Sequence, residues 1–244
     1  MKFLGSWLVL AGVVTGIATA ADAPSQPSAG TIPANYRLVF EQHFDGPESL
    51  AAFVFSDPKA WRFSDDGASR TLELAQQSQY QPAVRSPVNQ ALIRDRIFGD
   101  FILEVDLLQT GKEYGHRDMC LFFGVQDPTH FYYAHVATKT DDHAHNVFLV
   151  KDAPRTKISS ATTPGVNWGL GVWHRVRLER RGSSIQVFFD DMSRPIMTAE
   201  DANFGPGWVG FGSFDDTGKV DNVRIWAPSA PEMKAIPFFQ SAAP

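Results

Sequence analysis

The chain has 244 residues, of which 43% are hydrophobic, and its formal net charge at pH 7 is −5. This hydrophobic content is enough for a sizeable core, whereas the acidic balance argues against a nucleic-acid partner, which binds to a basic surface. It also disfavours a polyanionic polysaccharide unless a local basic patch exists. The single cysteine, Cys120, excludes an internal disulfide, so packing or a metal must stabilise the fold.

The N-terminus has the features of a secretory signal peptide over residues 1–20. Lys2 supplies a positive charge, an apolar run follows, and Ala18-Thr19-Ala20 is a cleavage site of the A-x-A type. The apolar run is shorter than the ~20 residues that a spanning helix needs, so we expect cleavage and no membrane insertion. Residues 21–35, rich in Pro, Ser and Ala, are predicted to be a flexible leader. The mature protein is expected to be secreted or periplasmic in a bacterium.

Residues 36–227 are predicted to form one domain, and the Pro- and Ala-rich residues 228–244 a loosely ordered tail. The clearest period-2 alternation lies in residues 101–108. One face of that segment carries four apolar residues, Phe101, Leu103, Val105 and Leu107. About a dozen strand-like segments follow one another without a sustained helical period. The sequence therefore predicts an all-β fold, a two-sheet antiparallel β-sandwich with jelly-roll order.

Several of these strands resemble those of the concanavalin A-like lectin/glucanase superfamily. The similar segments are residues 38–46 (LVFEQHFDG), 99–107 (GDFILEVDL), 173–178 (WHRVRL), 185–191 (IQVFFDD) and 220–225 (VDNVRI). Within the superfamily, the chain looks most like the secreted 3-keto-disaccharide hydrolase domain family. The resemblance implies a carbohydrate-active protein that cleaves a glycosidic bond, such as a 3-keto-glycoside bond, on the concave sheet.

One strand also resembles a catalytic motif. Residues 104–109 (EVDLLQ) are similar to the ExDxxE strand of family 16 glycoside hydrolases, whose carboxylates act as nucleophile and general acid. Gln109 stands where the acid would be, and a glutamine side chain cannot donate the required proton. We therefore predict that Glu104 and Asp106 are outer-face residues without a catalytic role.

The histidine-rich residues 117–151 are predicted to form three strands that carry the functional site. The first strand places Met119, Leu121 and Phe123 on the core face, and Asp118, Cys120 and Phe122 on the other. The second strand places Tyr132, Ala134 and Val136 on the core face, and Phe131, Tyr133 and His135 on the other. The outer face is expected to be an open groove whose aromatic rings and hydrogen-bonding groups suit a saccharide.

If these two strands pair, Asp118 or Cys120 comes into contact with Tyr133 or His135 across the ladder. A histidine beside a carboxylate is a candidate general base, and a satisfied core histidine is the alternative interpretation. The predicted catalytic residues are His135, His145 and Asp118. Cys120 is predicted to be a buried small hydrophobe, with a nucleophile as the alternative.

His143 and His145 share one face if their segment is extended. With Asp141 or Asp142 they are candidate ligands of a transition metal, and a solvated rim is the alternative. The further predicted substrate-binding residues are His116, Tyr133, His143, Lys151, Arg155, Trp168 and Arg85.

Three of those candidates, Lys151, Arg155 and Trp168, have specific interpretations. A basic run is formed by Lys151, Arg155 and Lys157. One interpretation is that it recognises a carboxylate or sulfate on an acidic sugar, and the alternative is that it is a solvated edge of the sheet. Trp168 lies between glycines, either stacked on a pyranose ring or packed over the end of the sandwich.

A structural Ca²⁺ ion is the one cofactor suggested, because related jelly rolls often bind calcium near their first and last strands. Its predicted ligands are Asp215, Asp216, Asp221 and Glu41, which supply hard oxygen atoms. A plain Asp-rich turn is the alternative, and no organic cofactor is predicted.

Three functions remain open from the sequence. The favoured one is an enzyme that cleaves an oligo- or polysaccharide by hydrolysis or β-elimination. The second is a non-catalytic, lectin-like glycan-binding module, which needs aromatic rings but no proton-transfer pair. The third is a structural or adhesive surface protein, favoured if Tyr133 and His135 are buried and their polar atoms satisfied.

Overall fold

The described part of the chain comprises residues 32–234 and Phe239 of a computed structural model. The predicted signal peptide, the leader up to residue 31 and most of the tail beyond residue 234 lie outside the described residues. Within the described part, no helix combines the length and the apolar character that crossing a membrane requires. Two short 3-10 helices, Pro47–Ala52 and Pro58–Ala60, interrupt a chain of β-strands.

The larger of two antiparallel sheets has nine strands. They are β1 (Arg37–Gln42), β3 (Trp61–Asp65), β4 (Arg70–Leu74), β6 (Phe101–Gln109), β11 (Ser159–Thr162), β12 (Trp173–Arg181), β13 (Ser184–Phe189), β14 (Met197–Glu200) and β16 (Gly218–Ala227). Their order is β11-β14-β13-β12-β6-β16-β4-β3, and β1 pairs with the C-terminal half of β16.

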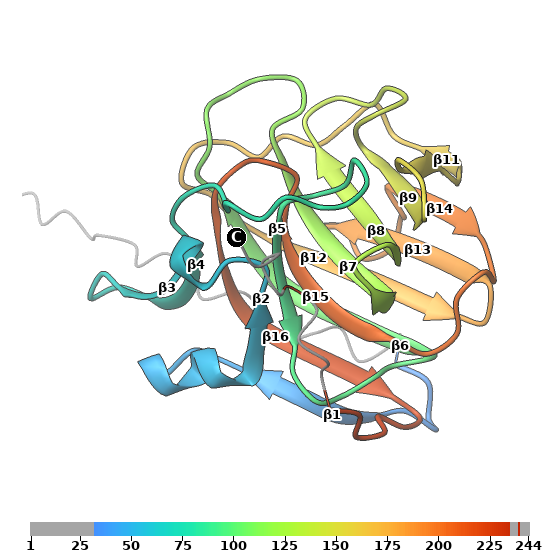
Figure 1. Cartoon of the computed structure of the whole chain (residues 1–244), viewed down its shortest axis with the longest axis horizontal. Helices are drawn as coiled ribbons and strands as arrows, with labels where there is room; N and C mark the ends of the chain where they lie inside the picture. The colour runs from blue at the N-terminus through green and yellow to red at the C-terminus, as the bar shows by residue number, and fades with distance from the viewer. Residues whose placement is uncertain (1–31, 235–238, 240–244) are drawn as a thin grey trace, which may run out of the picture. The chain divides into compact units, whose positions relative to one another are not determined.

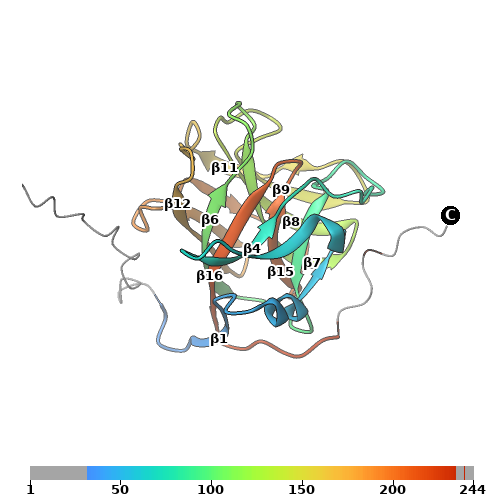
Figure 2. The same cartoon turned by 90° about the vertical axis from the view of Figure 1, so that its left-hand side faces the viewer.

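The smaller sheet has seven strands. They are β2 (Phe53–Phe55), β5 (Asn89–Ile93), β7 (Asp118–Asp127), β8 (His130–Ala137), β9 (Asn146–Lys151), β10 (Thr156–Lys157) and β15 (Trp208–Ser213). Their order is β10-β9-β8-β7-β15-β5-β2. Figures 1 and 2 show the two sheets as packed layers, with β6, β12 and β16 in one and β7, β8 and β15 in the other. The predicted antiparallel β-sandwich is confirmed.

The main core lies between the sheets and follows the alternation of the strands. On β6, Leu103, Val105 and Leu107 are fully buried and belong to this core. Met119 on β7 and Val136 on β8 enter it from the other sheet. The predicted core faces of these strands are confirmed, because alternate residues of a strand point to opposite faces.

Acidic residues on the outer face of β6 are paired with arginines of β12. The register places Asp106 opposite Arg175 and Glu104 opposite Arg177. The Arg175 Nε atom lies 2.8 Å from Asp106 Oδ1, and the Arg177 Nε atom lies 3.7 Å from Glu104 Oε1. Glu104 and Asp106 are thus on the outer face, as predicted. Because their carboxylates face guanidinium groups, they act as structural ion pairs.

The outer face of the smaller sheet carries a second hydrophobic cluster. Its members are Leu92, Cys120, Phe122, Val125, Phe131, Tyr133, Phe148, Val150 and Trp208. Val84 of the β4–β5 connection, Ile97 and Phe239 pack against it, and Figure 1 shows that connection passing across the smaller sheet. Over most of its width this face is therefore a second dry core and not the open groove that the sequence predicted.

The close approach of β5 and β15 requires a glycine at position 212. A Cβ atom there would lie 1.9 Å from the carbonyl oxygen of Asn89. We predict that Gly212→Ala lowers the free energy of unfolding by about 2 kcal/mol or more, because the strands must separate. Gly205→Ala is the matched control, since a Cβ at Gly205 meets nothing within 4 Å. Urea denaturation measures both changes, and equal stabilities of the two variants would contradict the expected clash.

Candidate functional site

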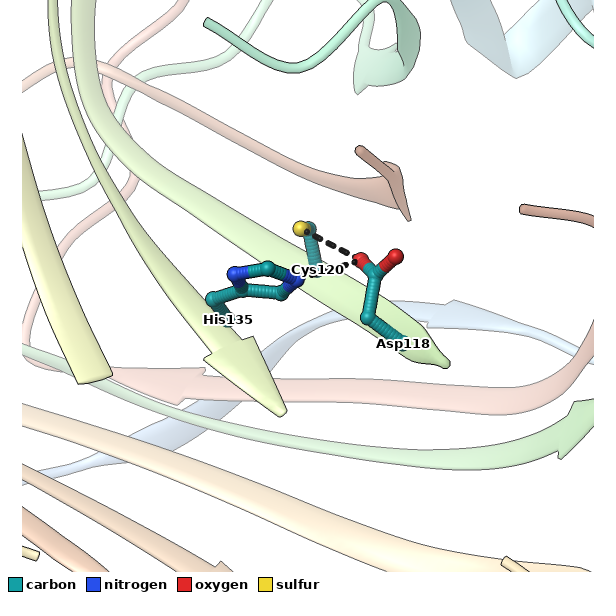
Figure 3. Close-up of side chains that lie close together, drawn as sticks. All are labelled: Asp118, Cys120 and His135. Atoms are coloured by element: carbon teal, nitrogen blue, oxygen red, sulfur yellow. Dashed lines mark hydrogen bonds and ion pairs between the residues drawn. The ribbon is translucent and has the colours of Figure 1, made fainter. Parts of the chain in front are cut away.

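The pairing of β7 with β8 brings three reactive side chains together. Cys120 lies directly opposite His135 in the register, and Asp118 lies two residues before Cys120 on the same face. The His135 Nε2 atom is 3.3 Å from Asp118 Oδ2, and the Cys120 thiol donates to the same oxygen at 3.1 Å. Figure 3 shows the imidazole and the sulfur turned toward the carboxylate. The predicted proximity of Asp118 and Cys120 to His135 is confirmed.

The Asp118 carboxylate is buried and held from two sides. Its Oδ2 atom accepts a hydrogen bond from the backbone N–H of Phe214 at 2.9 Å, in addition to the thiol. Its own backbone N–H donates to Asp216 Oδ2 at 2.9 Å. The second carboxylate oxygen, Oδ1, has no hydrogen-bond partner among the described residues. A buried polar atom without a partner is rare in folded proteins and marks this position as one that needs an explanation.

The orientation of His135 fixes its tautomer in the neutral state. Its Nδ1 atom lies 3.1 Å from the carbonyl oxygen of His143. Because a carbonyl only accepts hydrogen bonds, Nδ1 carries the proton and Nε2 presents a lone pair in the neutral ring. Nε2 has no hydrogen bond within the described part of the chain, although it faces Asp118. In the neutral ring, the lone pair of His135 Nε2 therefore faces the Asp118 Oδ2 oxygen in a buried position.

His135 forms the inner wall of a small pocket of about 90 Å³. The pocket is lined by Arg85, Tyr114, His116, His135, His143, Arg155, Phe214 and Asp215. Five of these, Arg85, His116, His135, His143 and Arg155, are predicted catalytic or substrate-binding residues that the fold brings together. Sequence reasoning missed Tyr114 and Phe214, because neither stands in a pattern that distinguishes a site residue from an ordinary loop aromatic.

Two arginines give the pocket a positive side. The Arg155 guanidinium lies 4.3 Å from the ring centroid of Phe214, and that of Arg85 lies 5.9 Å from it. Neither forms an ion pair with a carboxylate within residues 32–234, and Arg155 Nε is buried without a hydrogen-bond partner. Arg155 is instead held by its contact with the ring and by a long hydrogen bond to the His143 carbonyl oxygen, 3.4 Å.

Acidic groups also gather at this pocket. Oxygen atoms of Asp118, Asp215 and Asp216 lie within 4.8 Å of one another. Burial, together with the charge of Asp118, raises the pKa of Asp216 to about 7. The Tyr114 hydroxyl donates to Asp216 Oδ2 at 2.9 Å, and burial beside these carboxylates raises the pKa of Tyr114 well above its usual value. Burial and Asp118 likewise raise the pKa of Cys120.

The loop that carries Tyr114 separates this pocket from a larger one of about 290 Å³. The larger pocket is lined by Glu113, Tyr114, Gly115, Arg117, Thr138, Lys139, Asn167 and Trp168. Tyr114 contributes to both pockets, and 44% of its surface is exposed. An exposed aromatic ring between two hollows is a surface on which a sugar ring can stack.

Three other predicted site residues are buried or lie elsewhere. Tyr133 is fully buried and stacks on Phe148 at 5.1 Å, so its ring cannot contact a ligand directly. Trp168 lines the larger pocket but is only 1% exposed, because it packs edge-on against Phe189. Lys151 is exposed away from both pockets and donates to Asn203 at 2.8 Å.

His145 lies outside the pocket because the backbone alternation breaks at it. Its φ angle is 51°, in the left-handed region, so His143 and His145 do not share a face. The Nδ1 atom of His145 accepts from the Ala137 N–H at 3.3 Å, and its Nε2 donates to the Thr163 hydroxyl at 3.0 Å. The predicted catalytic role of His145 therefore has no geometric support. The two histidines also form no metal-ligand group with Asp141 or Asp142 among the described residues.

The four carboxylates predicted to bind Ca²⁺ do not form one group. Asp215 and Asp216 cluster with Asp118, as described above. Glu41 instead accepts a hydrogen bond from Arg224 at 2.9 Å, and Asp221 lies opposite Asp106 in the β16–β6 register. The proposed set therefore does not fit a single calcium ion, and no step of the chemistry is assigned to it.

Comparison with solved structures finds this fold in other proteins. The chain is similar to a carbohydrate-binding module from Bacillus subtilis, with 18% identity, a TM-score of 0.50, and coverage of 70% of this chain and 93% of that one. It is also similar to a Bacillus subtilis protein of unknown function with a galectin-like fold. The identity is 12%, the TM-score is 0.53, and the match covers 81% of this chain and 100% of that one. A third similar structure is a non-specific endo-β-1,3(4)-glucanase of family 16, with 9% identity, a TM-score of 0.51, and coverage of 82% of this chain and 94% of that one. At these identities the likeness establishes the fold.

The sequence matches no protein-family model, and it matches no curated protein. The coarser resemblance to concanavalin A-like folds agrees with the structural neighbours. Membership of the 3-keto-disaccharide hydrolase family stays a prediction.

The buried His145 predicts an acid-sensitive fold. Burial, and secondarily the nearby His135, lowers the pKa of His145 from 6.5 to about 4. The unfolded chain therefore binds this proton more tightly than the folded chain. The stability that the neutral His145 side chain contributes is complete above about pH 6.5 and is lost as the pH falls toward 4.

We expect His145→Gln, which can still accept from Ala137, to lose less stability between pH 7 and pH 4.5 than the wild type. The difference should be about 2 kcal/mol, because the pKa of His145 falls from 6.5 to about 4 on folding. Urea denaturation at both pH values measures it. Parallel losses in the two proteins would show that His145 does not titrate as described.

Proposed function

We propose that the protein is an extracytoplasmic carbohydrate-active enzyme that cleaves a glycosidic bond beside Asp118 and His135. One observation carries the proposal: the pocket gathers ionisable and aromatic side chains from segments that are distant in sequence. Arg85, Tyr114, His135 and Arg155 come from four such segments. The predicted signal peptide supports secretion or a periplasmic location. Neighbours of the same fold include a carbohydrate-binding module and a glucanase, which supports saccharide chemistry.

The two pockets would hold sugar units on either side of Tyr114. The exposed ring of Tyr114 offers a flat apolar surface to the C–H face of a pyranose. His116 and His143 are exposed at the rim of the smaller pocket, where their ring nitrogens can bond to hydroxyl groups. His116 is itself oriented by Asp141, whose Oδ2 lies 2.5 Å from its Nε2. An oligo- or polysaccharide is therefore the expected partner.

The two arginines favour a saccharide that carries an acidic group. Their guanidiniums line the pocket without a carboxylate partner in the described chain, and a planar guanidinium matches a carboxylate or sulfate. The basic run predicted from the sequence contributes only Arg155, because Lys157 pairs with Asp142 at 2.6 Å. This local positive side offsets the negative charge of the whole chain.

The unsatisfied atoms of His135, which lines the pocket, and of Asp118 beside it favour an enzyme over a binding module. Asp118 Oδ1 and His135 Nε2 are buried without hydrogen bonds, and each such atom costs about 1–3 kcal/mol. Glycan binding alone does not require such costly atoms, whereas energetically unfavourable groups are typical of reactive centres. The structural or adhesive alternative requires Tyr133 and His135 to be buried and satisfied. Both are buried, but neither the Tyr133 hydroxyl nor His135 Nε2 has a hydrogen-bond partner in the described chain. Cleavage of a 3-keto-glycoside is the specific form that the family resemblance supports.

The enzymatic proposal predicts product formation from at least one member of a panel of neutral, uronate-containing and sulfated polysaccharides. His135→Ala should lower the rate at least 100-fold, because it removes the nitrogen that faces Asp118. His130→Ala is the matched control on the same strand, since His130 pairs with Asp127 and Asp152 outside the pocket. Reducing-end release and the absorbance of unsaturated sugars distinguish hydrolysis from elimination. Retention on a glycan without any product would instead establish a binding module.

The arginines predict a preference that depends on ligand charge. Arg85→Ala and Arg155→Gln should each raise the KM for an acidic oligosaccharide about tenfold, the loss of roughly one charge-assisted hydrogen bond. The KM for a neutral oligosaccharide should change less than twofold. Arg194→Ala, an exposed arginine on the β13–β14 loop, serves as the control. An equal change for acidic and neutral ligands would contradict a role in recognising the acidic group.

A further inference from the structure

We propose that Asp118, Cys120 and His135 bind a divalent transition-metal ion, most naturally Zn²⁺, at the inner end of the pocket. The inference rests on the proposed function and extends it, because it names a metal ion at the candidate catalytic residues Asp118 and His135. It can be tested without a saccharide, so the two proposals can fail separately.

The three donor atoms are already arranged around one point. One ligand atom of each residue lies within 4.8 Å of the others. The Oδ2 atom of Asp118 is 3.1 Å from the sulfur and 3.3 Å from His135 Nε2. Tetrahedral Zn²⁺ with bonds of about 2.0–2.3 Å separates its ligand atoms by about 3.3–3.8 Å. Binding therefore requires only small shifts of these side chains.

The tautomer of His135 leaves the correct nitrogen for a metal. Its Nδ1–H donates to the His143 carbonyl oxygen, so the lone pair of Nε2 points toward Asp118. Metal-ligating histidines commonly donate their other N–H to a backbone carbonyl in this way, which fixes the ring. Without a cation or an added proton, the Nε2 lone pair and the carboxylate repel each other. A metal ion turns this repulsive contact into two bonds.

The carboxylate is also prepared as a ligand. The Phe214 N–H fixes the orientation of Asp118 through Oδ2, and hydrogen-bonded carboxylates of this kind are usual around metals. The Oδ1 atom has no hydrogen-bond partner in the described chain and is available as a second oxygen ligand. Asp118 and His135 are at least 97% buried, so these unpartnered atoms have no compensating bulk water.

The donor set and the local charge select the kind of metal. A thiolate and an imidazole favour Zn²⁺ and similar ions over Ca²⁺ or Mg²⁺, which prefer oxygen ligands alone. Binding requires loss of the Cys120 proton, which a dication at this distance drives. Asp215 adds negative charge nearby and offsets the Arg155 guanidinium. Three protein ligands leave one position for water or substrate, and His135 lines the pocket on that side.

Cobalt titration of the chelator-treated, full-length mature protein tests the site. We expect one Co²⁺ per chain, with a near-ultraviolet thiolate charge-transfer band and the intense visible bands of tetrahedral Co²⁺. Zn²⁺ should displace it. Cys120→Ala, which removes only the sulfur atom, should abolish the thiolate band. His135→Ala should weaken Zn²⁺ binding at least tenfold, roughly the loss seen when metal-supporting residues are removed.

The control is His130→Ala, which should bind Co²⁺ with an unchanged spectrum and affinity, and circular dichroism confirms that each variant is folded. A wild-type protein that shows no thiolate band, or a Cys120→Ala variant that keeps it, overturns the proposal. Stabilisation by Ca²⁺ without any cobalt spectrum also overturns it, because it assigns the ion to the carboxylates alone. A metal-binding protein that cleaves no glycan would refute the proposed function and leave the metal site standing.

Discussion

The register between β7 and β8 is the constraint on which the rest of the site depends. It sets Cys120 directly opposite His135 and leaves Asp118 beside them. A slip of one residue would turn these polar side chains into the main core and expose the apolar ones. Met119 and Val136 oppose such a slip, because each fully buried apolar side chain contributes about 1.5–3 kcal/mol. The alternation that builds the core thereby also assembles the polar centre.

The covered outer face determines what this centre can do. Phe122, Tyr133 and Phe148 surround it with apolar rings, so its charges interact in a medium that screens them far less than water does. His135 reaches the small pocket on the side that Arg155 and Phe214 also line, and there the centre is open to a ligand. A nearly dry centre next to a small polar opening is an arrangement typical of catalysis, whereas an extended wet groove would serve binding alone.

The sequence predicted the local features well and the long-range ones poorly. Alternation on β7 and β8 depends on neighbouring residues, so the core faces and the approach of Asp118 to His135 followed from the sequence. The cover over the outer face includes Val84, Ile97 and Phe239, which stand in no distinguishing local pattern, and the sequence therefore predicted an open groove there. The calcium ligands were grouped because related jelly rolls bind calcium near their first and last strands, but an extended strand advances about 3.3 Å per residue and carries Asp221 away from Asp216. The common face predicted for His143 and His145 assumed an extended backbone, which the positive φ of His145 contradicts.

Anomalous X-ray diffraction at the zinc absorption edge tests the central claim most directly, using crystals of the protein grown with Zn²⁺. The account predicts one strong anomalous peak within bonding distance of Cys120 Sγ, His135 Nε2 and the Asp118 carboxylate, with the pocket opening toward the fourth position. A map without a peak there, in crystals where β7 and β8 pair as described, would contradict it.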